Sequence, residues 1–215
     1  MKRNMLWAVC AGLAICFASC HDPQAVKNAV KNADAAINYG DAAKFKQQLE
    51  SLNDSSRVHV TLPDSLPVVY ATEDEVLHLE NGIVLFGWPR CPWFRNAVEP
   101  LFEFAREEHA TIYYLDIYDI RDTKELVDGQ VSTTKEGSAG YQAILKKFDA
   151  IWNPYTVLGV DSIKRISSPT VLFIEKGEGV HKVVSTVVSQ TEPAVKLTAA
   201  QREELKTRYR KYFTL

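Results

Sequence analysis

The chain has 215 residues, 46% of them hydrophobic, which is enough apolar material for one domain of ordinary size with its own core. Its 25 Lys and Arg residues against 27 Asp and Glu residues give a formal net charge of −2, without a long basic run. A nucleic-acid-binding protein needs clustered positive charge, so this balance predicts no nucleic-acid partner.

Residues 1–20 have the layout of a secretory signal, with a positively charged start, an apolar run over 5–17 and then small residues. The apolar run is too short to span a membrane. It ends in the letters FASC, which resemble the lipobox of bacterial lipoproteins. The resemblance implies cleavage before Cys20, lipidation of that residue, and anchoring to the outer face of the cell membrane or of another envelope membrane. The alternative is an ordinary secretory signal that has a cysteine near its cleavage site.

Export changes the cysteine count. Cys10 and Cys16 would leave with the signal, and lipidation would block Cys20, so that Cys91 would be the one free thiol of the mature chain. Exported proteins normally pair their cysteines. A lone cysteine is therefore a partner in an intermolecular disulfide, a reactive thiol or an inert remnant.

Residues 21–65 predict a helical spacer and linker between the signal and the domain. Apolar residues recur at helical spacing from 22 to 53, with a break expected at 39–41. Residues 53–56 and two prolines, Pro63 and Pro67, are typical of a linker.

From residue 66 to residue 215 the pattern alternates between strands and helices and predicts an α/β domain, with a central mixed sheet flanked by helices. Strands are expected at 68–70, 83–86, 111–115, 170–174 and 180–188, and helices at 72–79, 92–109, 141–151 and from 198 onward. The stretch 117–165 is expected to be an insertion. It is longer than a minimal domain of this kind requires.

Three local signals predict where helices begin. Thr72 with Glu75, and Thr198 with Gln201, have the spacing of capping boxes. Pro92 has the place of a first helical residue, where its missing N–H costs nothing.

The segment 87–96, GWPRCPWFRN, places Cys91 at a turn from a buried strand into a helix. Unpaired N–H groups and the positive end of the helix dipole favour a thiolate at such a position. Arg90 and Arg95 are expected to add positive charge.

Four segments together resemble exported thioredoxin-like proteins related to the bacteriocin transport accessory family, over most of residues 66–213. They read GWPRCPWFRNAVEP, IYYLDIYDIRD, KRISSPTVLFIEKGEGVHKVVSTVVSQ and LTAAQREEL. The resemblance implies a thioredoxin-like fold, with Cys91 as the attacking thiol and a cis bond before Pro169. It also implies that Ser168 offers backbone hydrogen bonds to an extended partner peptide. In these relatives the motif reads Cys-Pro-Trp-Cys-Arg-Asn, so Phe94 stands where they have the resolving cysteine.

Three interpretations of Cys91 follow. It acts as a monothiol in disulfide exchange or mixed-disulfide capture, with an external thiol or exported protein thiols and disulfides as partners. Alternatively, the domain has lost catalysis and binds exported proteins in an apolar groove, with Trp88, Trp93 and Phe94 as its lip. A peroxide-reacting thiol is the third interpretation, although the Pro and the Thr or Ser expected upstream are replaced by Gly87 and Trp88.

The remaining polar residues add few candidate sites. The five histidines share no metal-ligand spacing with one another or with Cys91, so we expect no metal and no other cofactor. Asp116 is expected to be either a solvated carboxylate at a strand end or a group that orients a proton beneath the Cys91 turn.

Overall fold

The computed structural model describes residues 39–213, and the signal segment with Cys20 lies outside them. The helices are α2 (Tyr39–Glu50), α3 (Glu73–His78), α4 (Pro92–Glu107), α5 (Ala139–Lys147) and α6 (Ala199–Phe213). The strands are β1 (Val68–Tyr70), β2 (Gly82–Gly87), β3 (Ile112–Asp116), β4 (Thr123–Val127), β5 (Gln130–Lys135), β6 (Thr170–Glu175) and β7 (Glu178–Val184). Within these residues, no helix is long and apolar enough to cross a bilayer.

A five-stranded mixed sheet organises the domain, with the strand order β1-β3-β2-β6-β7. Strands β1, β3 and β2 are parallel to one another, whereas β6 runs antiparallel to β2 and β7 antiparallel to β6. The expectation of an α/β fold built on a mixed sheet is therefore confirmed. The last strand is shorter than expected and ends at Val184, because Ser185 adopts a φ of 60°.

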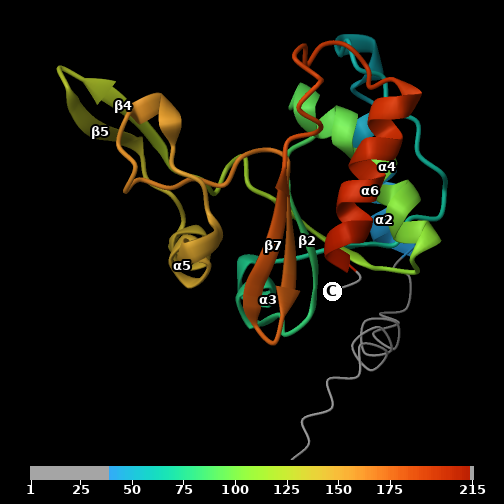
Figure 1. Ribbon diagram of the computed structural model, residues 1–215, viewed down its shortest axis with the longest axis horizontal. Coiled ribbons are helices and arrows are strands. Elements are labelled where there is room, and N and C mark those ends of the chain that lie inside the picture. The colour runs from blue at the N-terminus through green and yellow to red at the C-terminus, as the bar shows by residue number, and fades with distance from the viewer. Residues whose placement is uncertain (1–38, 214–215) are drawn as a thin grey trace, which may run out of the picture.

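Helices cover both faces of this sheet (Figure 1). Strand β2 is buried along its whole length and alternates between the two cores: Ile83 and Leu85 face one core, and Val84 and Phe86 face the other. The first core contains side chains of α2, α4 and α6, and the second contains side chains of α3 and α5. A continuous apolar strand is typical of such a doubly covered sheet.

Helix α2 lies inside the range that the sequence predicts as a spacer, but it packs as part of the domain. Its side chains Ala42, Phe45 and Leu49 are fully buried in the first core. Phe45 makes edge contacts with the rings of Tyr114, at 4.9 Å between centroids, and Phe102, at 5.2 Å. The apolar face that the sequence shows here is covered by the sheet and α4, so this part of the range is one layer of the fold.

The predicted linker is also packed against the domain. Val58, Val60, Leu62 and Leu66 are buried between α2 and β1 along the chain. Arg95 of α4 holds this segment in place, because its buried guanidinium donates hydrogen bonds to the carbonyls of Val58 and Leu49, among others.

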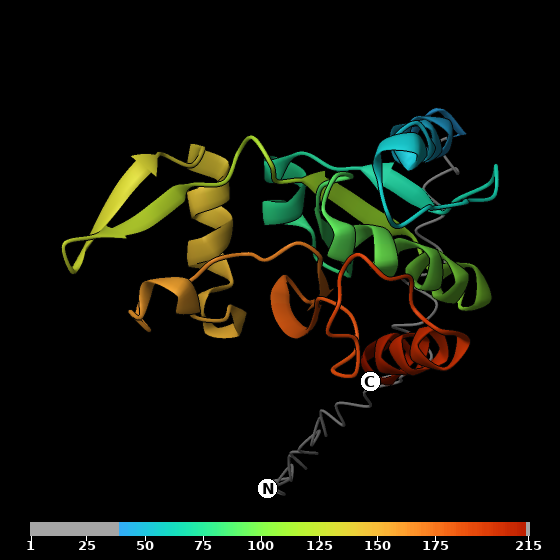
Figure 2. The ribbon, with the colours of Figure 1, turned by 90° about the horizontal axis from the view of Figure 1, so that it is seen from above.

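The insertion contains a β4–β5 hairpin that the sequence analysis missed. The hairpin projects away from the rest of the domain (Figure 2). Asp128 and Gly129 link its strands with φ values of 49° and 76°, which suits a two-residue hairpin turn of type I′. Most residues of both strands are exposed, so their sequence lacks the apolar alternation that reveals a half-buried strand. The predicted helix of the insertion forms as α5 and a 3₁₀ turn at Asp149–Ile151.

Three helices begin where the local sequence signals predict. Thr72 and Glu75 form the expected capping box at α3. Thr198 and Gln201 exchange the corresponding hydrogen bonds before α6, at 3.3 Å and 3.0 Å. Helix α4 has Pro92 as its first residue.

Glu99 joins α4 to the segments on either side of it. Its carboxylate accepts hydrogen bonds from Lys196, at 2.9 Å, from Arg202, and from the Thr61 backbone N–H, at 2.9 Å. Burial alone would raise the pKa of Glu99. The hydrogen bonds from Lys196 and from the Thr61 N–H are the largest opposing effects, and the pKa is lowered overall.

We expect Glu99→Gln to lower the free energy of unfolding by about 3 kcal/mol at pH 7, because it removes the charge that Lys196 and Arg202 neutralise. The folded-state pKa of Glu99 lies below its ordinary value of 4.5, so the charged carboxylate stabilises the fold above that pH. This stabilisation is lost as the pH falls through the folded-state pKa. The difference between the two proteins in urea unfolding should therefore shrink below about pH 4.5.

Glu125→Gln, at an exposed position on the hairpin, is the matched control and should change little at any pH. If the difference in the free energy of unfolding between the Glu99→Gln variant and the unchanged protein stays constant from pH 8 to pH 3, the charged Glu99 carboxylate does not stabilise the fold.

Candidate functional site

Cys91 is the N-cap residue of α4, in the turn that follows β2. Its N–H donates to the Trp88 carbonyl at 3.1 Å and closes the turn, and its own carbonyl accepts from the Arg95 N–H at 3.0 Å. The residue is 8% exposed. The thiol therefore lies at the positive end of a 16-residue helix, as the sequence predicts, and is buried.

The Ser168–Pro169 segment faces this thiol. Its peptide bond is cis, as the sequence analysis expects. The Cys91 Sγ donates a hydrogen bond to the Ser168 carbonyl at 3.3 Å. The pairing of β2 with β6 explains this contact, because Phe86 lies opposite Thr170 and the two chain segments leave the sheet side by side.

Phe94 does not form part of a surface lip, which corrects the sequence interpretation of this residue. It is fully buried, and its ring lies 5.7 Å from that of Tyr114 and 6.3 Å from that of Phe45. Phe94 begins the inward face of α4, one turn before Val98, and the helix turns its side chain toward the sheet.

Gly87 allows Phe94 to pack so closely beneath the turn. A Cβ atom at position 87 would lie 2.2 Å from Cδ2 of Phe94 and 2.8 Å from Oγ of Ser168. The glycine, the phenylalanine and the serine thus form one tightly packed layer below Cys91. The Ser168 hydroxyl in this layer is buried and has no hydrogen-bond partner.

The two arginines of the motif have different environments. Arg90 is exposed, whereas Arg95 is 2% exposed. Burial lowers the pKa of Arg95, although the nearby Glu99 carboxylate opposes this effect. The Arg95 guanidinium is bound by Asn53 and by carbonyls that include the one of Pro89, so its role is to hold the turn and α2 together.

The two tryptophans of the motif are both partly buried at the Cys91 turn. The ring of Trp88 lies 5.7 Å from that of Tyr118, and the guanidinium of Arg121 lies 4.2 Å from the Trp88 ring centre. The sequence analysis did not identify Arg121 as a neighbour of the turn, because it lies 30 positions after Cys91 and no local pattern connects the two.

A hollow of about 330 Å³ lies beside this aromatic pair. Its lining includes Trp88, Arg90, Asp116 and Tyr118 together with the end of α2. Asp116 accepts a hydrogen bond from the Tyr118 N–H at 2.9 Å, and partial burial raises the pKa of its carboxyl group. Asp116 therefore belongs to the wall of this hollow, next to the turn and opposite Gly87 in the sheet register.

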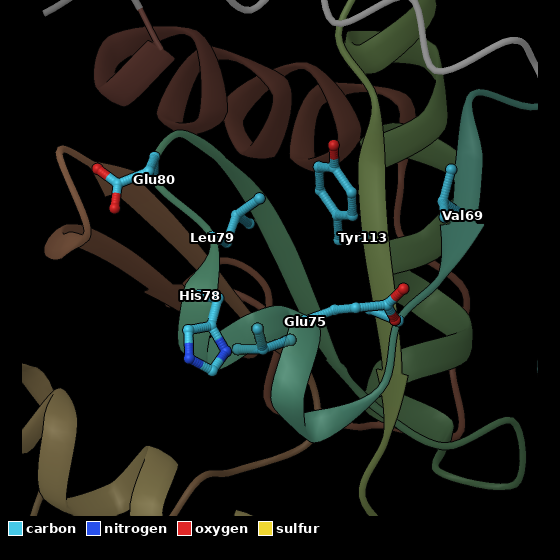
Figure 3. A pocket seen from close by; sticks show the side chains of 8 residues that line it. Val69, Glu75, His78, Leu79, Glu80 and Tyr113 are labelled. Atoms are coloured by element: carbon cyan, nitrogen blue, oxygen red, sulfur yellow. The ribbon is translucent and has the colours of Figure 1, made fainter.

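A second hollow, of about 300 Å³, lies where β2 begins (Figure 3). Leu79 and Tyr113 are part of its apolar lining, and Glu75, His78 and Glu80 are its charged or titratable residues. It lies at the opposite end of β2 from Cys91, so it takes no part in the thiol site. Within residues 39–213, no group of three or more Cys, His, Asp or Glu side chains is arranged to hold a metal ion.

Comparison with known proteins yields no match to a protein-family model and no significant match to a curated protein sequence.

The contact between Gly87 and Phe94 can be tested by a double-mutant cycle. We expect Gly87→Ala alone to lower the free energy of unfolding by about 2 kcal/mol, because its Cβ would overlap the Phe94 ring. In a Phe94→Ala background the ring is gone, so the cost of Gly87→Ala should fall by about 1 kcal/mol or more in urea unfolding.

Gly179→Ala serves as the control, because its Cβ would meet Phe148 and Leu172 in the other core. The cost of Gly179→Ala should be the same with and without Phe94. Strictly additive costs for Gly87→Ala and Phe94→Ala would show that the contact is absent.

Proposed function

We propose that this chain is a thioredoxin-like protein that exchanges disulfides through the single thiol of Cys91. The observation that carries the proposal is the hydrogen bond from Cys91 Sγ to the Ser168 carbonyl, next to the cis bond before Pro169. The sheet order β1-β3-β2-β6-β7, with the thiol at the turn from the central strand into a helix, supports it.

The chemistry requires only groups that lie at the turn. The Cys91 thiolate attacks one sulfur of a partner disulfide and forms a new sulfur–sulfur bond. The other partner sulfur leaves with the electron pair and takes up a proton. The product is a mixed disulfide between Cys91 and the partner.

Phe94 determines how the mixed disulfide is released. The buried ring occupies the position from which a second cysteine would attack, so the chain has no internal resolving thiol at this turn. A free thiol of the partner can attack the mixed disulfide and regenerate Cys91, which rearranges the partner's disulfides without net oxidation. A separate thiol compound can also resolve it, and the partner is then reduced.

An exported location fits this chemistry, because protein disulfides form and persist outside the cytoplasm. The proposal therefore includes an exported protein tethered through lipidated Cys20, as the signal segment predicts. Ser168 and Pro169, with Trp88 and Trp93 at the turn, are the proposed contacts for an extended partner peptide.

A binding module without catalysis is the second candidate. The low exposure of Cys91, 8%, and the hollow beside Trp88 and Tyr118 favour it, since both would suit a docking surface better than an accessible nucleophile.

Exchange activity distinguishes the two candidates. We expect the full chain to restore activity to ribonuclease with scrambled disulfides several times faster than its Cys91→Ser variant does. The tryptic peptide 91–95 should be found joined to ribonuclease peptides when the reaction is quenched with acid. Equal rates for the two proteins, with peptide 91–95 present only as the free thiol, would leave the binding module as the function.

Replacement of Phe94 by cysteine tests the missing resolver. We expect Phe94→Cys to accelerate the reduction of insulin disulfides by dithiothreitol by about tenfold or more, because it supplies the second thiol of a dithiol cycle. The variant also leaves a cavity in the core, so its free energy of unfolding should fall by about 3 kcal/mol.

Phe94→Ser is the matched control, since it leaves nearly the same cavity without a thiol. If the two variants reduce insulin at the same rate, the absent resolver is not what limits the natural protein.

A further inference from the structure

Two arginines lie at the base of the insertion, one on each of its stems. Arg121 is on the outgoing stem after β3, and Arg165 is on the returning stem before β6. Arg165 Nη2 donates a hydrogen bond to the carbonyl of Asp122 at 2.9 Å. This bond joins the two stems and brings the two guanidinium groups to the same region.

Both stems lie next to the segments that surround the thiol. The Arg121 guanidinium lies over the ring of Trp88, whose carbonyl accepts the hydrogen bond from the Cys91 N–H. Arg165 precedes by three residues the Ser168 carbonyl that accepts from the Cys91 Sγ. Arg121 thus lies over a residue of the turn that carries the thiol, and Arg165 lies on the segment that leads to the Ser168 carbonyl.

No carboxylate among the described residues forms an ion pair with Arg121 or Arg165, although thirteen ion pairs are present elsewhere in residues 39–213. Arg165 instead contacts the ring of Tyr155, at 4.5 Å, and its buried Nε has no hydrogen-bond partner. Two neighbouring cations that are partly removed from water favour the binding of an anion.

The electrostatics of Arg121 support this interpretation. Burial lowers its pKa, and the positive charge of Arg165 lowers it further. The nearby aromatic hydroxyl groups and the Cys91 sulfur act in the opposite direction, because negative charge on them stabilises the guanidinium cation. Arg121 and the Cys91 sulfur are therefore close enough to interact electrostatically.

We propose that Arg121 and Arg165 bind the carboxylate of a small thiol or disulfide compound that exchanges with Cys91. The inference rests on the proposed exchange function and adds to it the chemical class of the external thiol. In the resolving reaction, the thiolate of this compound attacks the Cys91 sulfur of the mixed disulfide and bonds to it, and the partner sulfur leaves with the electron pair and takes up a proton. A second molecule of the compound then attacks the sulfur of the first. The Cys91 sulfur leaves with the electron pair and takes up a proton, and the disulfide of the compound is released.

The arginine pair contributes binding and orientation. The attacking compound carries two negative charges, one on its thiolate and one on its carboxylate. The two guanidinium groups neutralise the charge of the carboxylate. The low exposure of Cys91, 8%, is compatible with a small compound as the external thiol.

The reverse step tests the inference on the full chain. Cys91 is allowed to react with three disulfide probes of different charge: dithiodipropionate, which is anionic, bis(hydroxyethyl) disulfide, which is neutral, and cystamine, which is cationic. Each reaction yields Cys91 bonded to half of the probe and releases the other half as a thiol. The adduct is quantified on tryptic peptide 91–95, which excludes the other cysteines, and each rate is divided by the rate of the same probe with the urea-unfolded chain.

We expect the anionic probe to react about tenfold faster than the neutral probe, and the cationic probe to react more slowly than the neutral one. Arg121→Gln and Arg165→Gln should each remove most of this preference, whereas Arg121→Lys should retain part of it. Arg106→Gln, at an exposed position near the end of α4, is the matched control and should leave the preference unchanged.

Equal normalised rates for the three probes, or an anionic preference that survives both arginine substitutions, would overturn this inference and leave the proposed function intact. If no probe modifies Cys91 in the folded chain, the proposed exchange function fails and the inference fails with it. Circular dichroism of each variant establishes that the comparison is made between folded proteins.

Discussion

The antiparallel pairing of β2 with β6 is the constraint on which the site depends. Phe86 at the end of β2 lies opposite Thr170 at the start of β6, so the segments beyond the sheet, one ending in Cys91 and the other in Pro169, meet at one edge. A shift of this register by one residue would turn β2 over and exchange the side chains that the strand places in the two cores, which are packed around different neighbours. The packing of the cores therefore also determines the distance between the thiol and the Ser168 carbonyl.

The packing at Phe94 connects this site to the stability of the fold. Its ring belongs to an aromatic cluster with Phe45 and Tyr114, in which each ring contact contributes about 0.5–1.5 kcal/mol. Phe45 belongs to α2, so the N-terminal helix is held by the same cluster that fills the space beneath Cys91. Phe94, in the first turn after Cys91, is thus also a core residue, and a substitution at this position would also affect the packing of α2 on the sheet.

Local signals in the sequence were sufficient to predict most elements of the sheet and the starts of its helices. The apolar run of β2, the capping box at Thr72 and the proline at position 92 act over a few residues, and the structure confirms them. Long-range packing was not predictable in the same way. The apolar face of α2 is visible in the sequence, but nothing local shows that the sheet covers it. The inward position of Phe94 did have a signal, because Val98 and Phe102 repeat its face of the helix at intervals of four.

Two features of the insertion were not predicted from the sequence: its hairpin and the proximity of its two arginines. The turn at Asp128 and Gly129 was a usable hairpin signal, but the strands on either side of it are exposed and carry no apolar period. Arg121 and Arg165 are 44 positions apart, and no local pattern connects them. They become neighbours only because the insertion leaves the sheet after β3 and returns before β6, with Arg165 hydrogen-bonded across its base. Both ends of the insertion lie next to the Cys91 turn. The register of the sheet brings the sulfur to the Ser168 carbonyl, and the base of the insertion places Arg121 over Trp88 in the same turn.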